Sequence, residues 1–445
     1  MSILHYFFHW VGRLTGTIVI IPHPITIGNC GEDIYYGLMK ARREGKKLVI
    51  FFPYELPWHL RIRIPNREMS KLESPYRVFL PSNPLYVLCC VFISLFFGFF
   101  RGISIVTERY FKYRLRESYI IPMLGQELLW KPKAVTGHFS WDVVQAYEWD
   151  KQAERWLEIA IAQQSQSIAE RQRKEMGLPA NAWFVCLHVR EGGYHNDRAL
   201  TDERNADIDN YLPAIQEITR RGGWVVRMGD TTMKRLPPMD RVIDYPFSAQ
   251  KNELMDVYLL KECHTYVGMQ SGILDVATMF QRPTILTNMY SWFLGYPQKE
   301  TDLGILKHVY SKSRQRFLSP MEWPLIPWAY QAFDPREDFV FYENSAAELV
   351  ELVTEYFDRS PGWAPSAPQL AFNELRLRMA KELLGKPLSD KGPPEDDIYA
   401  RYRLAARLMT AKGMLGAVFL QSNSVPPEAI AAVNSDIASV ASSGK

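Results

Sequence analysis

The most constraining feature of this sequence is a regular alternation of apolar runs and amphipathic segments between residues 182 and 290. Ala182–Val189 (AWFVCLHV) is almost continuously apolar, which is typical of a strand buried on both faces of a parallel sheet. The same reasoning predicts further strands at 224–228, 242–245, 265–269, 284–288 and 339–342, and helices at 210–221, 253–262, 273–281 and 346–357. Strands that alternate with helices in this way predict an α/β fold with a doubly wound parallel sheet.

A second, shorter alternation opens the chain. Thr17–Pro22 and Lys47–Phe52 are predicted strands, and the helix between them is predicted at 34–45, after a glycine-containing loop at 23–33. The sequence therefore predicts two Rossmann-like domains, at 1–140 and 180–362. A bridging helix is expected at 141–179, and a C-terminal helical extension with a flexible tail at 363–445.

Composition and motifs exclude several classes of protein. The 445 residues carry a net charge of only +3, and the five cysteines include no C-x-x-C pair, so neither a disulfide framework nor a structural zinc site is expected. Walker A, G-x-G-x-x-G, G-x-S-x-G and H-E-x-x-H motifs are absent from the sequence, which disfavours the enzyme classes that carry them. No nucleic-acid partner is expected, because the basic excess is local and interleaved with aliphatic residues.

That local excess lies between Lys40 and Val135, where 17 Lys and Arg face 7 Asp and Glu. The same stretch contains Leu85–Phe100, an uncharged run of 16 residues that is shorter than the roughly 20 that a membrane-spanning helix needs. One interpretation is that residues 78–116 lie on the anionic surface of the cytoplasmic membrane. The other is a buried core helix beside a solvated basic face. The N-terminus has no charged segment typical of a secretory signal, so we expect a cytoplasmic protein, peripheral on the inner membrane face.

Polar residues follow the predicted strands of the 180–362 region, where the carboxyl ends of an open parallel sheet bind ligands. They are His188 and Arg190, then Arg227, then Gln270-Ser271-Gly272 before a helix, and Asn288. Arginines beside a helix N-terminus suit a diphosphate. Asp207-Ile208-Asp209 has the spacing of a metal-binding D-x-D, but a helix N-cap is the favoured interpretation, and no metal is expected.

Four blocks in this order carry a resemblance to a known family. HVREGGY (188–194), RNADIDNY (204–211), GGWVVRMGD (222–230) and GMQSG (268–272) resemble a group of bacterial glycosyltransferases. More distantly, the strand followed by His-x-Arg and the later Ser-Gly helix start are similar to fucosyltransferase-like two-domain (GT-B) enzymes. The resemblance covers about residues 180–290 and implies a GT-B fold.

The resemblance implies a metal-independent, inverting transfer of a sugar from a nucleotide-activated donor, with no cofactor besides the donor substrate. The basic and apolar region 78–116 motivates a lipid-linked or surface-polysaccharide acceptor at the inner membrane face. The implied diphosphate-binding residues are His188, Arg190, Arg227, Gln270, Ser271, Gly272 and Asn288, and the implied donor pocket is Arg204, Asn205, Asp207 and Tyr211. The general base is expected in the first domain, where the candidates are Glu32, Asp33, His23 and His138.

Two other functions fit the same sequence. A nucleotide-sugar epimerase or isomerase on this fold would turn over the donor without an acceptor. A non-catalytic partner would bind the nucleotide sugar and transfer nothing.

Overall fold

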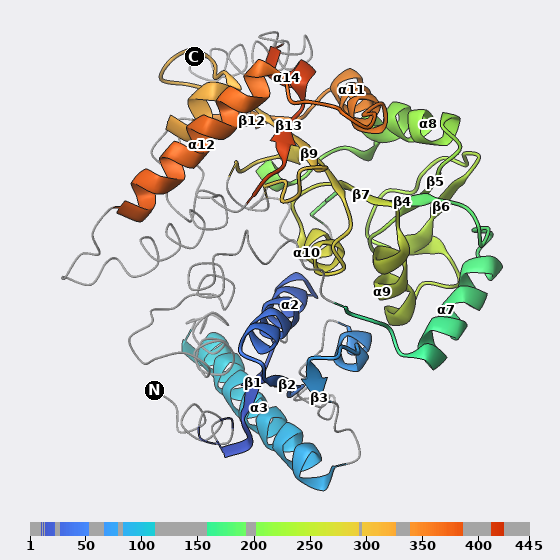
Figure 1. The fold of residues 1–445 in the computed structure, drawn as a ribbon, viewed down its shortest axis with the longest axis vertical. Helices are drawn as coiled ribbons and strands as arrows, with labels where there is room; N and C mark the ends of the chain where they lie inside the picture. Colours follow the sequence, from blue (N-terminus) through green and yellow to red (C-terminus); the bar gives the residue numbers. More distant parts are fainter. Residues whose placement is uncertain are drawn as a thin grey trace. The chain divides into compact units, whose positions relative to one another are not determined.

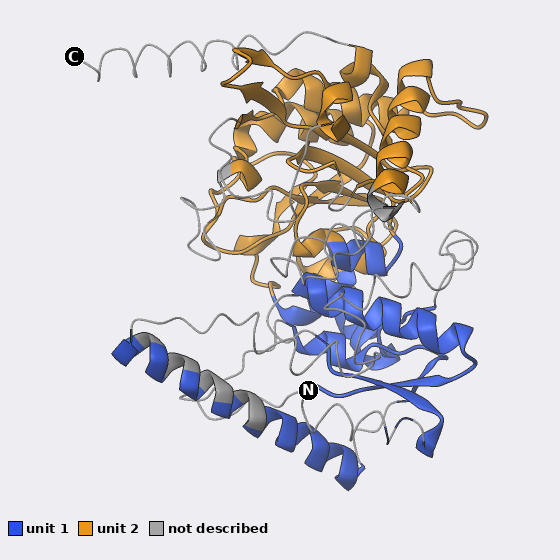
Figure 2. Ribbon diagram, turned by 90° about the vertical axis from the view of Figure 1, so that its left-hand side faces the viewer, with its two compact units in different colours: residues 1–169, 252–258, 275–281 blue, residues 170–251, 259–274, 282–445 orange. Residues whose placement is uncertain are grey.

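We analysed a computed structural model of the chain (Figure 1). The structure describes residues 10, 12, 14–22, 27–52, 66–78, 83–111, 158–192, 202–292, 296–325, 339–385 and 411–421. The chain forms two compact units (Figure 2). Unit 1 comprises residues 1–169, 252–258 and 275–281, and unit 2 comprises residues 170–251, 259–274 and 282–445.

Unit 1 contains a small parallel sheet in the order β1-β2-β3. Its strands are β1 (Thr17–Ile20), β2 (Lys47–Ile50) and β3 (Arg77–Val78), so the predicted β-α-β opening is present. Helix α2 (Ile27–Arg43) connects β1 to β2 and starts seven residues before the predicted start. The segment IGNCGED, expected as a loop, is therefore helical. A β-carbon on Gly37 would lie 3.1 Å from side-chain atoms of Ile20 and Leu48, so α2 packs very closely on this sheet.

Two further helices differ from the sequence prediction or refine it: α7, which spans the boundary between the units at residues 169 and 170, and α3 in unit 1. The predicted bridging helix at 141–179 is shorter in its described part: α7 spans only Gln163–Glu175, and residues 158–162 are not helical, with Ala160 forming an isolated β-bridge to Glu73. Helix α3 (Pro84–Phe111) contains the apolar run 85–100. Within the described residues, no helix combines the length and apolar character needed to cross a membrane.

Unit 2 is built on a seven-stranded parallel sheet in the order β13-β9-β8-β7-β4-β5-β6 (Figure 1). The predicted doubly wound sheet is thus confirmed as a large parallel α/β sheet. Strands and helices alternate, and the central strands are fully buried because helices cover both faces. The strands are β4 (Phe184–His188), β5 (Trp224–Arg227), β6 (Val242–Asp244), β7 (Thr265–Gly268), β8 (Thr284–Met289), β9 (Leu303–Leu306) and β13 (Met414–Leu415).

The connecting helices agree closely with their predicted positions. They are α8 (Leu212–Arg220), α9 (Glu253–Glu262), α10 (Gly272–Met279) and α11 (Ala346–Phe357). Ser345 and Glu348 form the predicted capping box at the start of α11. The predicted strand 339–342 is β12 (Phe339–Tyr342), but it pairs antiparallel with β10 (His308–Ser311) in a separate small sheet with β11 (Arg316–Phe317).

The C-terminal region is more than the predicted helical extension. It contains α12 (Ala367–Gly385) and α14 (Ala417–Gln421), but between them β13 adds an edge strand to the large sheet. Arg376 of α12 is buried, lies 4.6 Å from the ring centroid of Tyr296 and donates a hydrogen bond to the carbonyl of Ala411. Gln369 donates to the carbonyl of Leu415 at 2.7 Å. These buried contacts make the described part of the segment integral to unit 2.

Candidate functional site

The strand order of the large sheet creates a topological switch point between β4 and β7. From β4 the chain proceeds outward through β5 and β6, whereas β7, β8 and β9 extend on the other side. The last residues of the two central strands, His188 and Gly268, are register partners. In open α/β sheets, ligands bind in the crevice at the carboxyl ends of strands at such a point. Two of the polar features predicted from the sequence, His188-Val189-Arg190 and Gln270-Ser271-Gly272, therefore flank the switch point.

The backbones of the two strands approach each other closely at this point. Gly268 has φ +145°, and a β-carbon there would lie 2.1 Å from the carbonyl oxygen of His188. The amide of Met269 donates to the same oxygen at 3.1 Å. Only glycine fits this position, because both the dihedral angle and the available space exclude a side chain.

His188 is a buried, neutral imidazole. Its Nδ1 lies 3.3 Å from the carbonyl oxygen of Met228, and since a carbonyl can only accept, Nδ1 carries the proton. Burial, together with the positive charges of Arg227 and Arg190, lowers the pKa of His188 to about 4. At neutral pH, Nε2 is therefore a hydrogen-bond acceptor. The expected diphosphate role of His188 stays a prediction, in which a neutral imidazole with its proton on Nδ1 would bring no positive charge to a phosphate.

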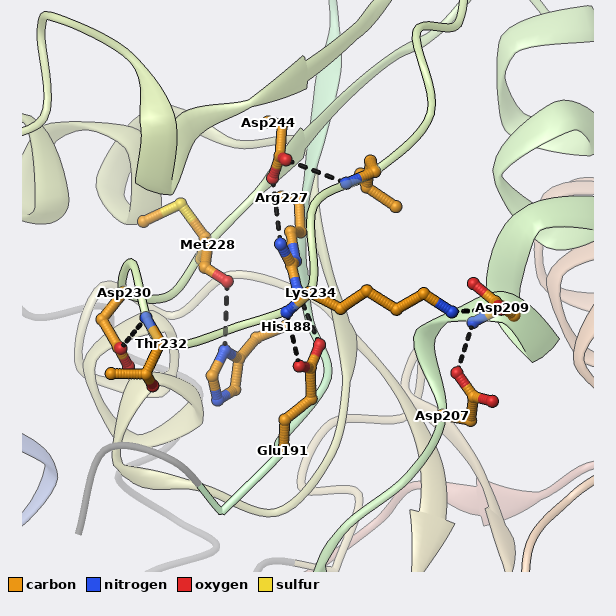
Figure 3. Close-up of polar contacts among 11 residues, drawn as sticks. His188, Glu191, Asp207, Asp209, Arg227, Met228, Asp230, Thr232, Lys234 and Asp244 are labelled. Atoms are coloured by element: carbon orange, nitrogen blue, oxygen red, sulfur yellow. Dashed lines mark hydrogen bonds and ion pairs between the residues drawn. The ribbon is translucent and has the colours of Figure 1, made fainter. Parts of the chain in front are cut away.

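Arg227 is the centre of a buried ion-pair cluster (Figure 3). Its side chain is 0% exposed, and its guanidinium donates to Glu191 at 2.7 Å and to Asp244 at 3.0 Å. Glu191 lies in the loop after β4, Arg227 is the last residue of β5, and Asp244 is the last residue of β6. The cluster therefore joins the ends of three neighbouring strands. The guanidinium is thus enclosed and paired with two carboxylates, and direct binding of the diphosphate by Arg227 stays a prediction.

The remaining carboxylate oxygens of this cluster organise the loop after β5. Glu191 accepts a hydrogen bond from the amide of Lys234 at 2.7 Å, and Asp244 accepts one from the amide of Leu236 at 3.0 Å. The ammonium of Lys234 forms an ion pair with Asp209 (Figure 3). The buried arginine thus contacts the two carboxylates that hold the loop after β5.

The segment 202–211 reaches the ends of three strands. The amide of Ala206 donates to the carbonyl of Arg190 at 3.0 Å, which places this segment beside the loop after β4. The ammonium of Lys307, just after β9, donates to the carbonyl of Asn205 at 2.6 Å. The guanidinium of Arg204 lies 5.5 Å from the ring centroid of Tyr290, just after β8. The structure therefore brings Arg204 and Asn205 to the same sheet edge as Arg190.

Two other residues of the predicted site, Tyr211 and Asn288, are buried in the core. Tyr211 is 1% exposed and its hydroxyl bonds Thr287 at 2.7 Å, and Asn288 is 0% exposed and donates to that hydroxyl at 2.9 Å. Asn288 and Asn344 also exchange two hydrogen bonds of 2.7 Å, each from a backbone amide to the other's Oδ1. In this arrangement both residues join β8 to its neighbours, and their ligand roles stay predictions.

Asp207 and Asp209 lie at a short 3-10 helix, Ile208–Tyr211. The side chain of Asp207 accepts from the amide of Asp209 at 3.0 Å, so Asp207 is an N-cap, the favoured of its two interpretations. Among the described residues, no group of three or more His, Cys, Asp and Glu side chains is arranged to hold a metal ion.

The loop after β7 leads directly into α10. Gln270 is 4% exposed, and its amide donates to the carbonyl of Ser291 at 2.9 Å, which ties this loop to the end of β8. Ser271 is half-buried, with its hydroxyl 3.5 Å from that of Tyr266, and Gly272 begins the helix. The backbone amides at this helix start carry the partial positive charge that favours an anion.

The four candidates for the general base lie in the N-terminal region. Glu32 and Asp33 were expected at the start of the first helix, but α2 begins at Ile27, so both lie in its second turn. Asp33 is only 4% exposed, and its charge adds to burial in raising the pKa of the Cys30 thiol. Asp33 therefore exposes little surface to a substrate, and its role as general base stays a prediction. His23 and His138 lie outside the described residues.

Several residues at this edge were not identified from the sequence. Glu191 and Asp244 are the partners of Arg227, and Lys307 is 3% exposed at the end of β9. Lys307 follows the short apolar run LGIL, which is a strand signal that could have identified it. The Asp244 pairing carries no local signal, because it depends on β6 lying beside β5.

Comparisons with known proteins give limited information on identity. No protein-family model and no curated protein matches the chain. Among solved structures, the glycosyl transferase family 9 protein from Veillonella parvula DSM 2008 is 9% identical, with a TM-score of 0.36 over 62% of this chain and 81% of that one. The E. coli ADP-heptose LPS heptosyltransferase II is 12% identical, with a TM-score of 0.39 over 76% of this chain and 98% of that one. At these TM-scores the likeness assigns neither a family nor an activity to the chain.

Proposed function

We propose that the protein is a glycosyltransferase that takes its sugar from a nucleotide-activated donor. The observation that carries the proposal is the register pairing of His188 with Gly268 at the switch point of the large sheet. Arg190 follows one of these strands and the α10 helix start follows the other, so a cationic residue and a helix N-terminus come directly after two neighbouring strands at the same edge of the sheet. Such a pair suits the diphosphate of a nucleotide sugar.

The proposed chemistry is electrostatic stabilisation of the leaving group. As the glycosidic bond to the diphosphate breaks, negative charge develops on the departing oxygen, and Arg190 together with the amides of Ser271 and Gly272 would stabilise it. Arg204 and Asn205 would line the donor pocket. His188 would accept a hydrogen bond from a donor hydroxyl through Nε2, and Arg227 would position the neighbouring loop through Glu191. An inverting, metal-independent transfer is the corresponding mechanism.

A lipid-linked or surface-polysaccharide acceptor, used by a protein peripheral on the cytoplasmic membrane, is motivated by the basic and apolar region 78–116. The general base would come from the N-terminal region, where Glu32 is the more accessible of the two described carboxylates.

A thermal-shift screen tests the donor site. The purified chain is heated with GDP, UDP, CMP, dTDP and ADP and with their sugar conjugates, since a ligand that binds only the native state raises the melting temperature. We expect one nucleotide series to raise it, and Arg190→Ala to abolish the shift. Arg171→Ala is the matched control, because Arg171 is 69% exposed on α7.

The outcomes separate the candidate functions. A shift retained in Arg190→Ala contradicts the site, and the absence of any shift in folded protein contradicts a nucleotide-sugar donor. With the donor identified, conversion of its sugar in the absence of an acceptor would indicate an epimerase. Binding without turnover on any acceptor would indicate a non-catalytic partner.

A further inference from the structure

Helix α3 exposes a continuous apolar stripe along its length. The sequence from Pro84 to Phe100 contains no charged residue, and the helix extends to Phe111. Large apolar side chains that are 37–69% exposed recur every three or four residues at Leu85, Leu88, Phe92, Leu95, Phe99 and Ile103. At 3.6 residues per turn, these positions fall within an arc of about 80°. The spacing continues to Val106 and Tyr110, which are 49% and 70% exposed.

The opposite face of α3 packs on unit 1. Cys90 is 2% exposed, and Ile93 and Ser94 are 0% exposed. The Tyr86 hydroxyl donates to the carbonyl of Ile50 at 2.8 Å, and its ring stacks on Phe51. Figures 1 and 2 show α3 at the periphery of this unit. The helix is therefore held by one face, and the stripe is a second apolar face.

We propose that this stripe docks the protein on the surface of an anionic lipid bilayer, with α3 lying in the plane of the membrane. A helix of 28 residues is about 42 Å long, so the stripe forms an extended edge suited to a planar partner. The proposal does not depend on the transferase activity, because docking requires no nucleotide.

The chemistry of the flanking residues favours lipid over a second protein helix. In a coiled-coil pair, charged residues flank the apolar seam and select the partner. Here the first 17 residues of α3 are uncharged, so the stripe is bordered by further apolar side chains such as Val91. Hydrocarbon accepts such a surface without requiring complementary charges.

The charge of the surrounding sequence favours an anionic bilayer. The stretch 40–135 carries 17 Lys and Arg against 7 Asp and Glu. At its C-terminal end, α3 presents Arg109 with its guanidinium 5.9 Å from the ring centroid of Tyr110. Basic and aromatic side chains together are typical of the membrane–water interface, where each basic residue near an anionic surface adds to the attraction.

Vesicle co-sedimentation of the full chain tests the proposal. The vesicles contain phosphatidylglycerol and phosphatidylcholine, or phosphatidylcholine alone. We expect binding to the anionic vesicles, and weaker binding to the neutral ones. The triple variant Leu88→Gln, Phe92→Gln, Leu95→Gln keeps helix propensity but removes three apolar anchors. Each anchor strengthens partitioning by about tenfold, so with partial insertion the triple variant should bind at least about 100-fold more weakly.

A matched control removes equally exposed apolar side chains from unit 2. Leu325→Gln, Leu370→Gln, Val418→Gln changes residues that are 54%, 53% and 41% exposed, and should leave vesicle binding unchanged. Melting temperatures of both variants establish that they are folded. Equal loss of binding in the two variants, or no binding of the unaltered chain to anionic vesicles, overturns the proposal.

A second measurement locates the helix directly. A polarity-sensitive fluorophore on Phe92→Cys, in a Cys89→Ser background, should shift to the blue on anionic vesicles. An unchanged spectrum overturns the proposal. Sedimentation velocity without lipid adds a further criterion. If the unaltered chain is an oligomer that the α3 triple variant dissociates, the stripe is instead an interface between copies, and the membrane assignment is wrong.

Discussion

The carbonyl oxygen of His188 occupies the space that a side chain on Gly268 would need. A β-carbon on Gly268 would lie 2.1 Å from that oxygen, and the glycine has φ +145°. The two residues are register partners at the ends of the central strands β4 and β7, so the close approach lies at the switch point of the large sheet. A side chain at residue 268 would push the two strand ends apart.

Gly268→Ala should therefore destabilise unit 2 strongly. We expect a loss of about 3 kcal/mol or more in the free energy of unfolding, since both backbone strain and overpacking act there. Urea denaturation measures it. Gly45→Ala is the control, because Gly45 also has positive φ but meets no atom within 4 Å, and should cost only about 1 kcal/mol. Equal losses would mean that steric contact with His188 is unimportant.

The cluster around Arg227 predicts a structural phenotype that does not depend on ligand. Arg227→Met leaves Glu191 and Asp244 without their shared cation, and breaking a buried pair from one side costs about 3–5 kcal/mol. Arg220→Met removes a pair whose arginine is 69% exposed and should cost less than about 1 kcal/mol. Denaturant unfolding without nucleotide provides the comparison. If Arg227→Met leaves the free energy of unfolding unchanged, the structural role is contradicted and a direct contact of Arg227 with the ligand is favoured.

The buried imidazole of His188 makes the stability of unit 2 dependent on pH. Its pKa in the folded state is about 4, against 6.5 for an unperturbed histidine, so the unfolded chain binds more protons between these values. Stability from this group is complete above pH 6.5 and is lost as pH falls towards 4. The full loss is on the order of 3 kcal/mol.

His188→Asn removes this titration, so its stability should fall less steeply than that of the unaltered protein between pH 6.5 and 4. Denaturant midpoints at several pH values measure both slopes. The pH dependence of His264→Asn serves as a comparison. Burial lowers the pKa of His264 as well, but the His264 side chain lies outside the candidate site. Parallel profiles for His188→Asn and the unaltered chain would contradict a buried, neutral His188.

Asn288 should prove essential for folding rather than for binding. Asn288→Ala leaves the buried amide of Asn344 without its acceptor and removes one of the two hydrogen-bond partners of the Tyr211 hydroxyl, which should cost about 2–4 kcal/mol. Asn83→Ala is a contrasting test, since Asn83 is an exposed cap of α3 that accepts from the amides of Leu85 and Tyr86, and should cost about 1 kcal/mol. A folded Asn288→Ala protein with impaired nucleotide binding would instead favour the predicted ligand role.

Local sequence signals worked best in the large sheet. The apolar run at 182–189 and the helix 253–262 need only periodicity and burial, and both were found at nearly the observed positions. Strand ends carrying His188, Arg190 and Gln270 could also be placed at one edge, because all carboxyl ends of a parallel sheet share that edge. Signals of this kind are contained in a few adjacent residues.

Errors arose where packing overrides propensity. Two glycines in IGNCGED indicate a loop, yet α2 begins at Ile27, since burial of an amphipathic face contributes more than the helix propensity of single residues. In the same way, β13 cannot be recognised from two residues, and becomes a strand only because β9 offers an open edge.

The sequence by itself determined the α/β class, the strands of the large sheet and the candidate anion-binding residues at their ends, because these follow from periodicity and chain direction. Only the tertiary structure decided which polar residues are available to a ligand. Arg190 and Arg227 both follow from the same sequence reasoning, but Arg227 is enclosed by Glu191 and Asp244. Strand order brings those carboxylates together, and strand order is a property of the folded sheet rather than of any local pattern.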